Sequence, residues 1–339
     1  MRNVAALTCC LALIGGTAQA VAAACPGNPR ALGTSRVMTL SPGELSRVGN
    51  MQYSRTLPLA DREVVLTFDD GPLPPYSTQV LEALAAECVK AVYFLVGRQA
   101  NAFPDMVRQI YNAGHTIGTH SQNHPLTFDR MSPERAEREI TDGIASVTAA
   151  LGDPTAVAPY FRIPGLLRVK PVEDYLASRS IITWSTDFVA DDWYKNITAK
   201  ESMRRALTRL DSKGRGILLL HDVQPATALM LPALLKELKQ RGYRIVQVVP
   251  GNSGARNLPV SSGPAKQGWP RIANTNNDSP PPIMMDNNNP PPASISAINT
   301  GRLGDKHSRK KSGKHEPAAT AGTRKHSRRT DFRLGFFPR

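Results

Sequence analysis

Long apolar stretches and cysteines are both scarce in this sequence of 339 residues. The apolar run at 4–16 is too short to cross a bilayer comfortably, and no later stretch approaches the roughly 20 apolar residues of a spanning helix. Only four cysteines are present, two of them in that first apolar run. The other two, Cys25 and Cys88, could form one disulfide in an oxidising compartment, although sequence alone does not pair them.

The first 24 residues have the pattern of an export signal. Arg2 gives a positive start, the apolar run at 4–16 follows, and small residues at 18–20 and 22–24 offer two cleavage sites. We therefore expect an exported protein that is periplasmic, associated with the cell wall, or secreted. The alternative is an N-terminus that stays anchored in the membrane.

Acidic residues are in short supply, since 28 Asp and Glu face 42 Lys and Arg. Most of this imbalance comes from residues 302–339, where 12 Lys and Arg stand against 3 Asp and Glu. Residues 251–339, with a Pro/Asn tract at 274–292, carry too little apolar surface to fold and are predicted to be a disordered tail. Such a tail is either a solvated linker or an adhesive for an anionic cell-surface polymer. We expect no nucleic-acid partner for an exported chain.

Short apolar runs alternate with amphipathic stretches between about 61 and 250. Strands are predicted at 63–68, 90–97, 180–185, 216–221 and 244–249, and helices at 76–87 and 228–242. This alternation indicates an α/β domain with a largely parallel, buried sheet. We place the catalytic domain at 61–250 and treat 25–60 as an N-terminal extension.

The first predicted strand runs into two adjacent carboxylates, Asp69 and Asp70. Two ionised carboxylates repel each other and are costly to bury without a cation. A divalent metal changes this balance, because one Asp can bind it while the other stays near enough to accept a proton. On its own, however, the D-D-G-P sequence is also typical of an ordinary acidic turn.

His120 and His124 are the matching candidates for the metal. If their segment is helical, the i, i+4 spacing places both imidazoles on one face. One Asp and two His leave coordination positions open, as a catalytic metal site requires. A histidine pair at this spacing is a weak signal by itself.

Five ordered motifs together resemble the polysaccharide deacetylase family, carbohydrate esterase family 4. They are T-F-D-D-G at 67–71, H-S-x-x-H at 120–124, R-x-P at 162–164, an acid-rich run ending in D-W at 192–193, and L-x-H at 219–221. The resemblance covers roughly residues 61–250 and is specific for the family, not for the substrate. It implies a distorted (β/α) barrel of about seven strands, with the active site at the C-terminal ends of the strands.

The resemblance also implies a role for each matching residue. Asp69 would be the general base, and Arg162 would position it. The divalent metal, zinc or alternatively cobalt, would be bound by three residues: Asp70, His120 and His124.

The other matching residues would act on the leaving group and the acetyl group. His221 would be the general acid, with its pKa tuned by Asp192. Trp193 and Leu219 would form the apolar pocket for the acetyl methyl. The backbone N–H of Gly165 would share the oxyanion with the metal.

Two departures from the family pattern stand out. The residue after R-x-P is usually bulky, and Gly165 is small, which would open the site. The acid run is also longer than usual, so Asp187, Asp191 and Asp192 are all candidates; Asp192 is preferred because it directly precedes Trp193.

These assignments predict an enzyme, a polysaccharide N-deacetylase that hydrolyses the acetamido groups of an acetylated oligosaccharide or polysaccharide. Chitooligosaccharide and peptidoglycan are both open as substrates. The alternatives are an O-deacetylase of xylan-type polymers and a non-catalytic carbohydrate-binding protein on the same scaffold. A non-haem iron oxygenase also uses two His and one carboxylate, but the second Asp, His221 and the export signal argue against it.

Overall fold

The computed structural model describes residues 25–251. The predicted export signal at 1–24 and residues 252–339 of the predicted tail lie outside the described residues. The strand pairings in the described part are parallel, so the predicted α/β class is confirmed. None of the described helices is long and apolar enough to cross a membrane.

The elements follow one another in an alternating order. The strands are β1 Thr34–Leu40, β2 Arg47–Val48, β3 Glu63–Asp69, β4 Val92–Leu95, β5 Thr116–Thr119, β6 Val157–Phe161, β7 Ile182–Trp184, β8 Phe188–Val189, β9 Gly216–His221 and β10 Arg244–Pro250. The α-helices are α1 Tyr76–Ala86, α2 Gly97–Ala102, α3 Pro104–Asn112, α4 Pro133–Leu151, α5 Lys170–Ser178, α6 Ala199–Lys213 and α7 Pro225–Gln240. Short 3-10 helices lie at Phe128–Arg130, Pro154–Ala156 and Pro164–Leu166.

Seven strands pair in one continuous row, in the order β7-β6-β5-β4-β3-β9-β8. This row is the distorted barrel that the family resemblance predicts, with β7 and β8 at its two ends. Strand β10 pairs with the first two residues of β3, β1 pairs with β10, and β2 pairs with β7. The described sheet therefore has ten strands.

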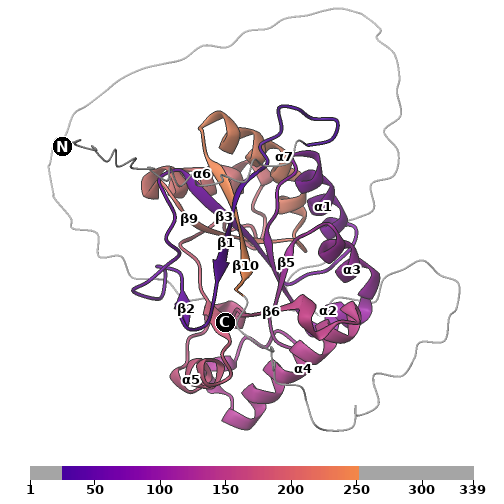
Figure 1. The fold of residues 1–339 in the computed structure, drawn as a ribbon, viewed down its shortest axis with the longest axis vertical. Helices are drawn as coiled ribbons and strands as arrows, with labels where there is room; N and C mark the ends of the chain where they lie inside the picture. The colour runs from indigo at the N-terminus through magenta and orange to yellow at the C-terminus, as the bar shows by residue number, and fades with distance from the viewer. Residues whose placement is uncertain (1–24, 252–339) are drawn as a thin grey trace, which may run out of the picture. The chain divides into compact units, whose positions relative to one another are not determined.

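The helices form a layer outside the strands. Contacts link neighbours in the order α6, α7, α1, α3, α4 and α5, and α7, α1, α3 and α4 follow one another along one side of the strands (Figure 1). Local signals set the ends of the longest helix, α4. The Ser132 side chain accepts a hydrogen bond from the backbone N–H of Arg135, and Gly152 ends the helix in the left-handed conformation.

The central strand β3 is buried along its whole length. Val64, Leu66 and Phe68 belong to the core between the strands and the helices, whereas Val65 belongs to a second cluster with Phe94, Tyr160 and Trp184. Side chains alternate along a strand, so Asp69 lies on the same face as Val65. The sequence thus directs the last carboxylate of β3 toward this second cluster.

The segment 25–60, set apart above as an N-terminal extension, contributes β1 and β2 to the same sheet. Its apolar residues Leu40, Val48 and Leu57 are buried in the second cluster. A disulfide joins Cys25 to Cys88 just after α1, with the two Cα atoms 5.7 Å apart. The structure therefore pairs the two cysteines that the sequence left open.

Candidate active site

The proposed site residues lie at the C-terminal ends of parallel strands. Strand β3 ends at Asp69 and β9 at His221, and these two residues are paired in register. His120 directly follows β5, and Arg162 directly follows β6. Parallel strands end at one edge of their sheet, so motifs far apart in the sequence converge there.

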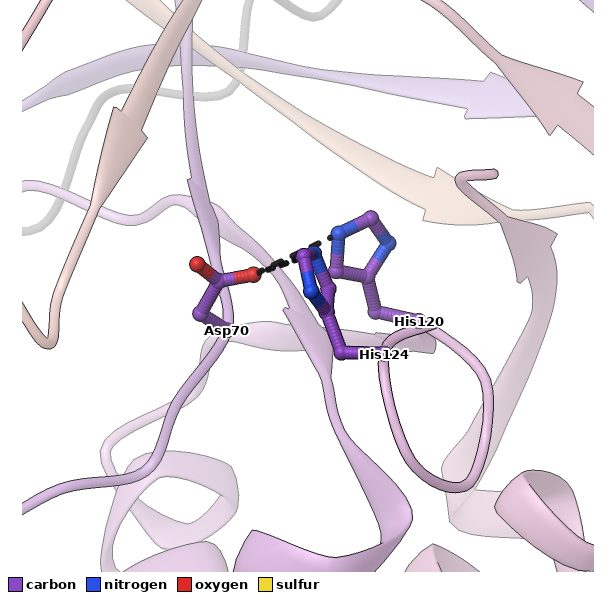
Figure 2. A group of neighbouring side chains, drawn as sticks. All are labelled: Asp70, His120 and His124. Carbon is purple, nitrogen blue, oxygen red and sulfur yellow. Dashed lines mark ion pairs between the residues drawn. The ribbon is translucent and has the colours of Figure 1, made fainter. Parts of the chain in front are cut away.

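Asp70, His120 and His124 form a candidate metal site. One ligand atom from each residue lies within 4.8 Å of the others. The Oδ1 atom of Asp70 is 3.4 Å from Nε2 of His120 and 3.2 Å from Nε2 of His124. Figure 2 shows both imidazoles turned toward this carboxylate.

The chemistry of these donors fits a cation. Nδ1 of His120 lies 2.7 Å from the carbonyl oxygen of Arg162, and a carbonyl only accepts, so Nδ1 carries the proton. Burial lowers the pKa of His120 to about 3, which keeps the ring neutral and leaves a lone pair on Nε2. That lone pair faces Asp70 Oδ1, a buried oxygen with no hydrogen-bond donor among the described residues.

The segment of the histidine pair is not helical, because His120 and His124 lie in the loop that follows β5. Ser121 and His124 have φ angles of 65° and 56°, in the left-handed region. The Ser121 hydroxyl accepts a hydrogen bond from the backbone N–H of His124 at 3.0 Å. A tight loop, and not a helix face, therefore brings the two imidazoles together.

Asp69 is held by Arg162, which is fully buried. Nη1 of Arg162 donates to Oδ1 of Asp69 at 2.6 Å and to the hydroxyl of Thr67 at 2.9 Å. Nη2 donates to the carbonyl of Ser185 at 2.9 Å. Burial raises the pKa of Asp69 to about 6 in spite of the nearby charge of Arg162.

Asp70 has the opposite electrostatic environment. Burial favours its protonated form, but electrostatic interactions with His124, His221, His120 and Arg98 outweigh burial and lower its pKa. The pKa values of the two adjacent carboxylates are thus shifted in opposite directions. Asp70 is the stronger acid and faces the imidazoles. Its backbone is left-handed, with φ of 77°, whereas Asp69 ends the strand. Both carboxylates nevertheless approach Nε2 of His120, Asp69 through Oδ2 at 3.7 Å and Asp70 through Oδ1 at 3.4 Å.

His221 is paired with Asp192. Nδ1 of His221 lies 2.9 Å from Oδ1 of Asp192, and the backbone N–H of His221 donates to Oδ2 at 2.7 Å. Thr227 also donates to this carboxylate. Burial by itself would lower the pKa of His221, but the Asp192 carboxylate, together with Asp70 and Asp69, raises it to about 10.

The structure separates the three candidate acids of the long run. Asp192 contacts Nδ1 of His221. Asp187 accepts from Thr56 and from the backbone N–H groups of Asn50 and Ile217. Asp191 instead forms ion pairs with two arginines of α6, Arg205 and Arg209.

The residues expected to contact substrate lie around these groups. The Trp193 ring is 5.2 Å from the His221 ring, measured between centroids. Leu219 is buried and lies opposite Thr67 of β3 in register. Gly165 is exposed and has a φ of 61°, and a Cβ there would lie 3.0 Å from the Leu126 side chain. The exposed Leu126 therefore borders the space next to this glycine.

Asp222 is a residue of the site that the motifs missed. It is fully buried, and its Oδ2 accepts a hydrogen bond from the Ser77 hydroxyl at 2.5 Å. A Cβ on Gly71 would lie only 2.2 Å from Oδ1 of Asp222. The glycine after the two acids is thus required by close packing against Asp222. The available signal was a second polar residue directly after His221 at the end of an apolar strand.

Comparison with known proteins agrees with this geometry. A family model described as "Polysaccharide deacetylase" matches residues 57–179. A peptidoglycan-N-acetylglucosamine deacetylase of Bacillus cereus is 31% identical over 208 residues, which cover 60% of this chain and 94% of that protein. The peptidoglycan-N-acetylglucosamine deacetylase PgdA of Listeria monocytogenes is 30% identical, but the match spans 56% of this chain and only 38% of PgdA.

A solved structure is also similar. The peptidoglycan deacetylase Bd3279 of Bdellovibrio bacteriovorus superposes with a TM-score of 0.58 and 29% identity. The superposition covers 65% of this chain and 60% of that one.

Proposed function

The chain belongs to the polysaccharide deacetylase family, and we propose that it is a metal-dependent hydrolase that removes N-acetyl groups from N-acetylglucosamine units, with peptidoglycan as its substrate. The observation that carries this proposal is the Asp70, His120 and His124 cluster beside two further titratable groups, Asp69 and His221. The named activities of the bacterial relatives support peptidoglycan over chitooligosaccharide.

Asp70, His120 and His124 would hold the divalent metal, which we propose to be zinc. Nitrogen and oxygen donors in this number suit zinc, and cobalt accepts the same set. When bound, the metal supplies Lewis-acid polarisation of the acetamido carbonyl and a lower pKa for water at the site.

Asp69 would be the general base. Its pKa of about 6 leaves it ionised at neutral pH, and the ion pair with Arg162 fixes its Oδ1 atom. Oδ2 lies 3.7 Å from Nε2 of His120, so this oxygen faces the candidate metal site. From there it would remove a proton from the attacking water as the water adds to the carbonyl carbon.

His221 would be the general acid. Asp192 raises its pKa to about 10, so the imidazole is protonated at neutral pH. It would donate this proton to the nitrogen as the C–N bond breaks, and the products would be acetate and a free amine on the sugar. The backbone N–H of Gly165 would donate to the oxyanion, while Trp193 and Leu219 would contact the acetyl methyl.

An oxidising, extracytoplasmic location supports a wall polymer as substrate. The disulfide between Cys25 and Cys88 is the observation behind it, because disulfides persist mainly outside the cytosol. We propose that the protein is exported, as the signal pattern at 1–24 predicts.

The test is acetate release from three substrates in parallel: peptidoglycan, chitooligosaccharides and acetylxylan, with and without a chelator. We expect acetate release from peptidoglycan and chitooligosaccharides and its loss after verified metal removal. Adding zinc back in the absence of oxygen should restore acetate release, since a hydrolase needs no oxygen. Release from acetylxylan alone would identify an O-deacetylase, and release that survives metal removal would contradict the mechanism. Binding of peptidoglycan without any release would indicate the non-catalytic alternative.

A further inference from the structure

A polar cavity of about 400 Å³ opens beside the segment that follows Arg162. Its lining includes three arginines, which come from β2, the loop after β2 and the segment before α5: Arg47, Arg55 and Arg168. Gln52, Tyr53 and Ser54 add polar groups, and no Asp or Glu of the described residues is part of the lining. Nothing in the deacetylation steps above uses this cavity.

The cavity carries an excess of positive charge. Glu173, whose side chain is only 2% exposed, lies behind the lining and pairs with both Arg47 and Arg168. One carboxylate thus balances two arginines. Asp174 also pairs with Arg47, but it pairs with Lys170 as well. The opposite charges of Asp174 and Lys170 cancel, so together they add no net charge. Arg55 is exposed, and its side chain has no ion pair or hydrogen bond with any described residue.

Arg47 and Arg168 are held in place before any ligand arrives. Nε of Arg168 donates to Glu173 at 2.7 Å, and its guanidinium lies 4.6 Å from the centroid of the Tyr53 ring. Tyr53 donates to the same carboxylate at 3.0 Å. A buried carboxylate with three donors orients the guanidinium groups, which lowers the entropy lost when they bind an anion.

The cavity is directly connected to the proposed catalytic residues. The Gln52 amide donates to the carbonyl of Leu166 at 2.6 Å, and its oxygen accepts from the Ser185 hydroxyl at 2.8 Å. Ser185 is the residue whose carbonyl binds Arg162. Arg168 follows Gly165 by three residues, so their Cα atoms are at most about 11 Å apart. A group in the cavity would therefore belong to a sugar close to the reacting one.

We propose that this cavity is a substrate subsite that binds a free carboxylate carried on a branch of the glycan, such as the peptide stem of peptidoglycan. Guanidinium groups match the planar carboxylate with paired hydrogen bonds. The subsite rests on the proposed function, since it selects among N-acetylated glycans and leaves the chemistry at the acetamido group unchanged. Arg55, with no partner of its own, supplies the main contact.

The test compares three substrates by acetate release. They are a peptidoglycan tetrasaccharide with free stem carboxylates, the same compound with those carboxylates converted to methylamides, and neutral chitotetraose. The variants are Arg55→Gln and, as a matched control, Arg215→Gln. Arg215 is also exposed but precedes β9, at the end of that strand opposite His221.

We expect Arg55→Gln to raise KM for the free-acid substrate about tenfold, the effect of losing one charged hydrogen bond, with kcat unchanged. The amidated substrate and chitotetraose should show no change, and Arg215→Gln should behave as the wild type with all three. An unchanged KM for the free acid, or an equal rise for the amidated compound, would overturn the subsite.

Calorimetry separates failure of the subsite from failure of the proposed function. If the wild type releases acetate from none of the substrates, the proposed function fails. Binding of the free-acid tetrasaccharide still reports on the cavity. Tighter binding of the free acid than of the amide, lost in Arg55→Gln, supports the subsite, whereas equal affinities overturn it.

Discussion

Arg162 Nη1 donates to Asp69 Oδ1 over 2.6 Å, in a pair whose side chains are 0% and 3% exposed. The same guanidinium lies 4.2 Å from the centroid of the Phe94 ring and donates to the Ser185 carbonyl. The R-x-P motif thus reaches across the inner face of the sheet to the end of β3. A buried pair of this kind is weak evidence for stability, but it fixes the position of a carboxylate.

Arg162→Lys should keep the charge and lose the fork of hydrogen bonds. We expect kcat to fall about 100-fold, since a small displacement of a reacting group has an effect of this size. Arg162→Met should instead lower the free energy of unfolding by about 3–5 kcal/mol, because it leaves the Asp69 carboxylate buried and unpaired. Denaturant unfolding and acetate release check the two variants. A fully active Arg162→Lys would show that Asp69 does not depend on the fork.

Asp69→Asn and Asp70→Asn should fail in different ways. Asp69→Asn should keep its metal and lose about 100–10,000-fold in turnover, the usual contribution of a general base. Asp70→Asn should lose affinity for the metal, because Asp70 supplies the only carboxylate of the candidate ligand set. Metal content and acetate release are measured on both purified variants. A metal-free Asp69→Asn beside a fully loaded Asp70→Asn would exchange the two roles.

Asp192→Asn should move the alkaline limb of the pH–rate profile to lower pH. The Asp192 carboxylate, together with Asp70 and Asp69, raises the pKa of His221 to about 10, so its removal should let the imidazole lose its proton at lower pH, by about one pH unit or more. Asp191→Asn is the matched control, since Asp191 pairs with Arg205 and Arg209 and not with His221. An unchanged alkaline limb in Asp192→Asn would assign that limb to another group.

Gly71→Ala should destabilise the protein by about 1–3 kcal/mol, the usual effect of overpacking, because the new Cβ would collide with the Asp222 carboxylate. Asp222→Ala removes the carboxylate with which the new Cβ would collide. The double variant should therefore lose less free energy of unfolding than the sum of the two single variants. Gly43→Ala is the control, since a Cβ there meets nothing within 4 Å. Additive free energies of unfolding would contradict this contact.

Replacing both Cys25 and Cys88 by Ser should lower the free energy of unfolding by about 2–4 kcal/mol, the typical contribution of a disulfide. The bond joins positions 63 residues apart, so its loss frees a long loop in the unfolded chain. Both residues are changed so that no free thiol remains. Acetate release at low temperature should stay normal, because the bond lies next to α1 and β4, away from the proposed catalytic residues. Equal stability of the oxidised wild type and the double variant would contradict the prediction.

The sequence by itself determined the fold class and predicted most residues of the candidate site. Short apolar runs such as 63–68 and 216–221 are typical of strands that are buried on both faces of a sheet, so β3 and β9 were predictable. The polar residues that end those runs, Asp69 and His221, were predictable for the same reason. A charged group directly after a buried strand is costly to bury unless it is paired with another charge or a metal, so it indicates a site.

Only the tertiary structure decided which partners these groups have. The spacing of His120 and His124 is compatible with a helix, but the pair lies in a loop. The left-handed backbone of Ser121 and His124 in this loop is not encoded by the local sequence pattern. Asp187, Asp191 and Asp192 differ by their contacts with residues of other elements, Thr56, Arg209 and His221 respectively. The close packing of Asp222 on Gly71 joins positions about 150 residues apart. The arginine cavity likewise joins β2 to the segment before α5. Such contacts follow from the strand order of the sheet, which no local pattern encodes, because each strand's neighbours are chosen by the packing of the whole domain.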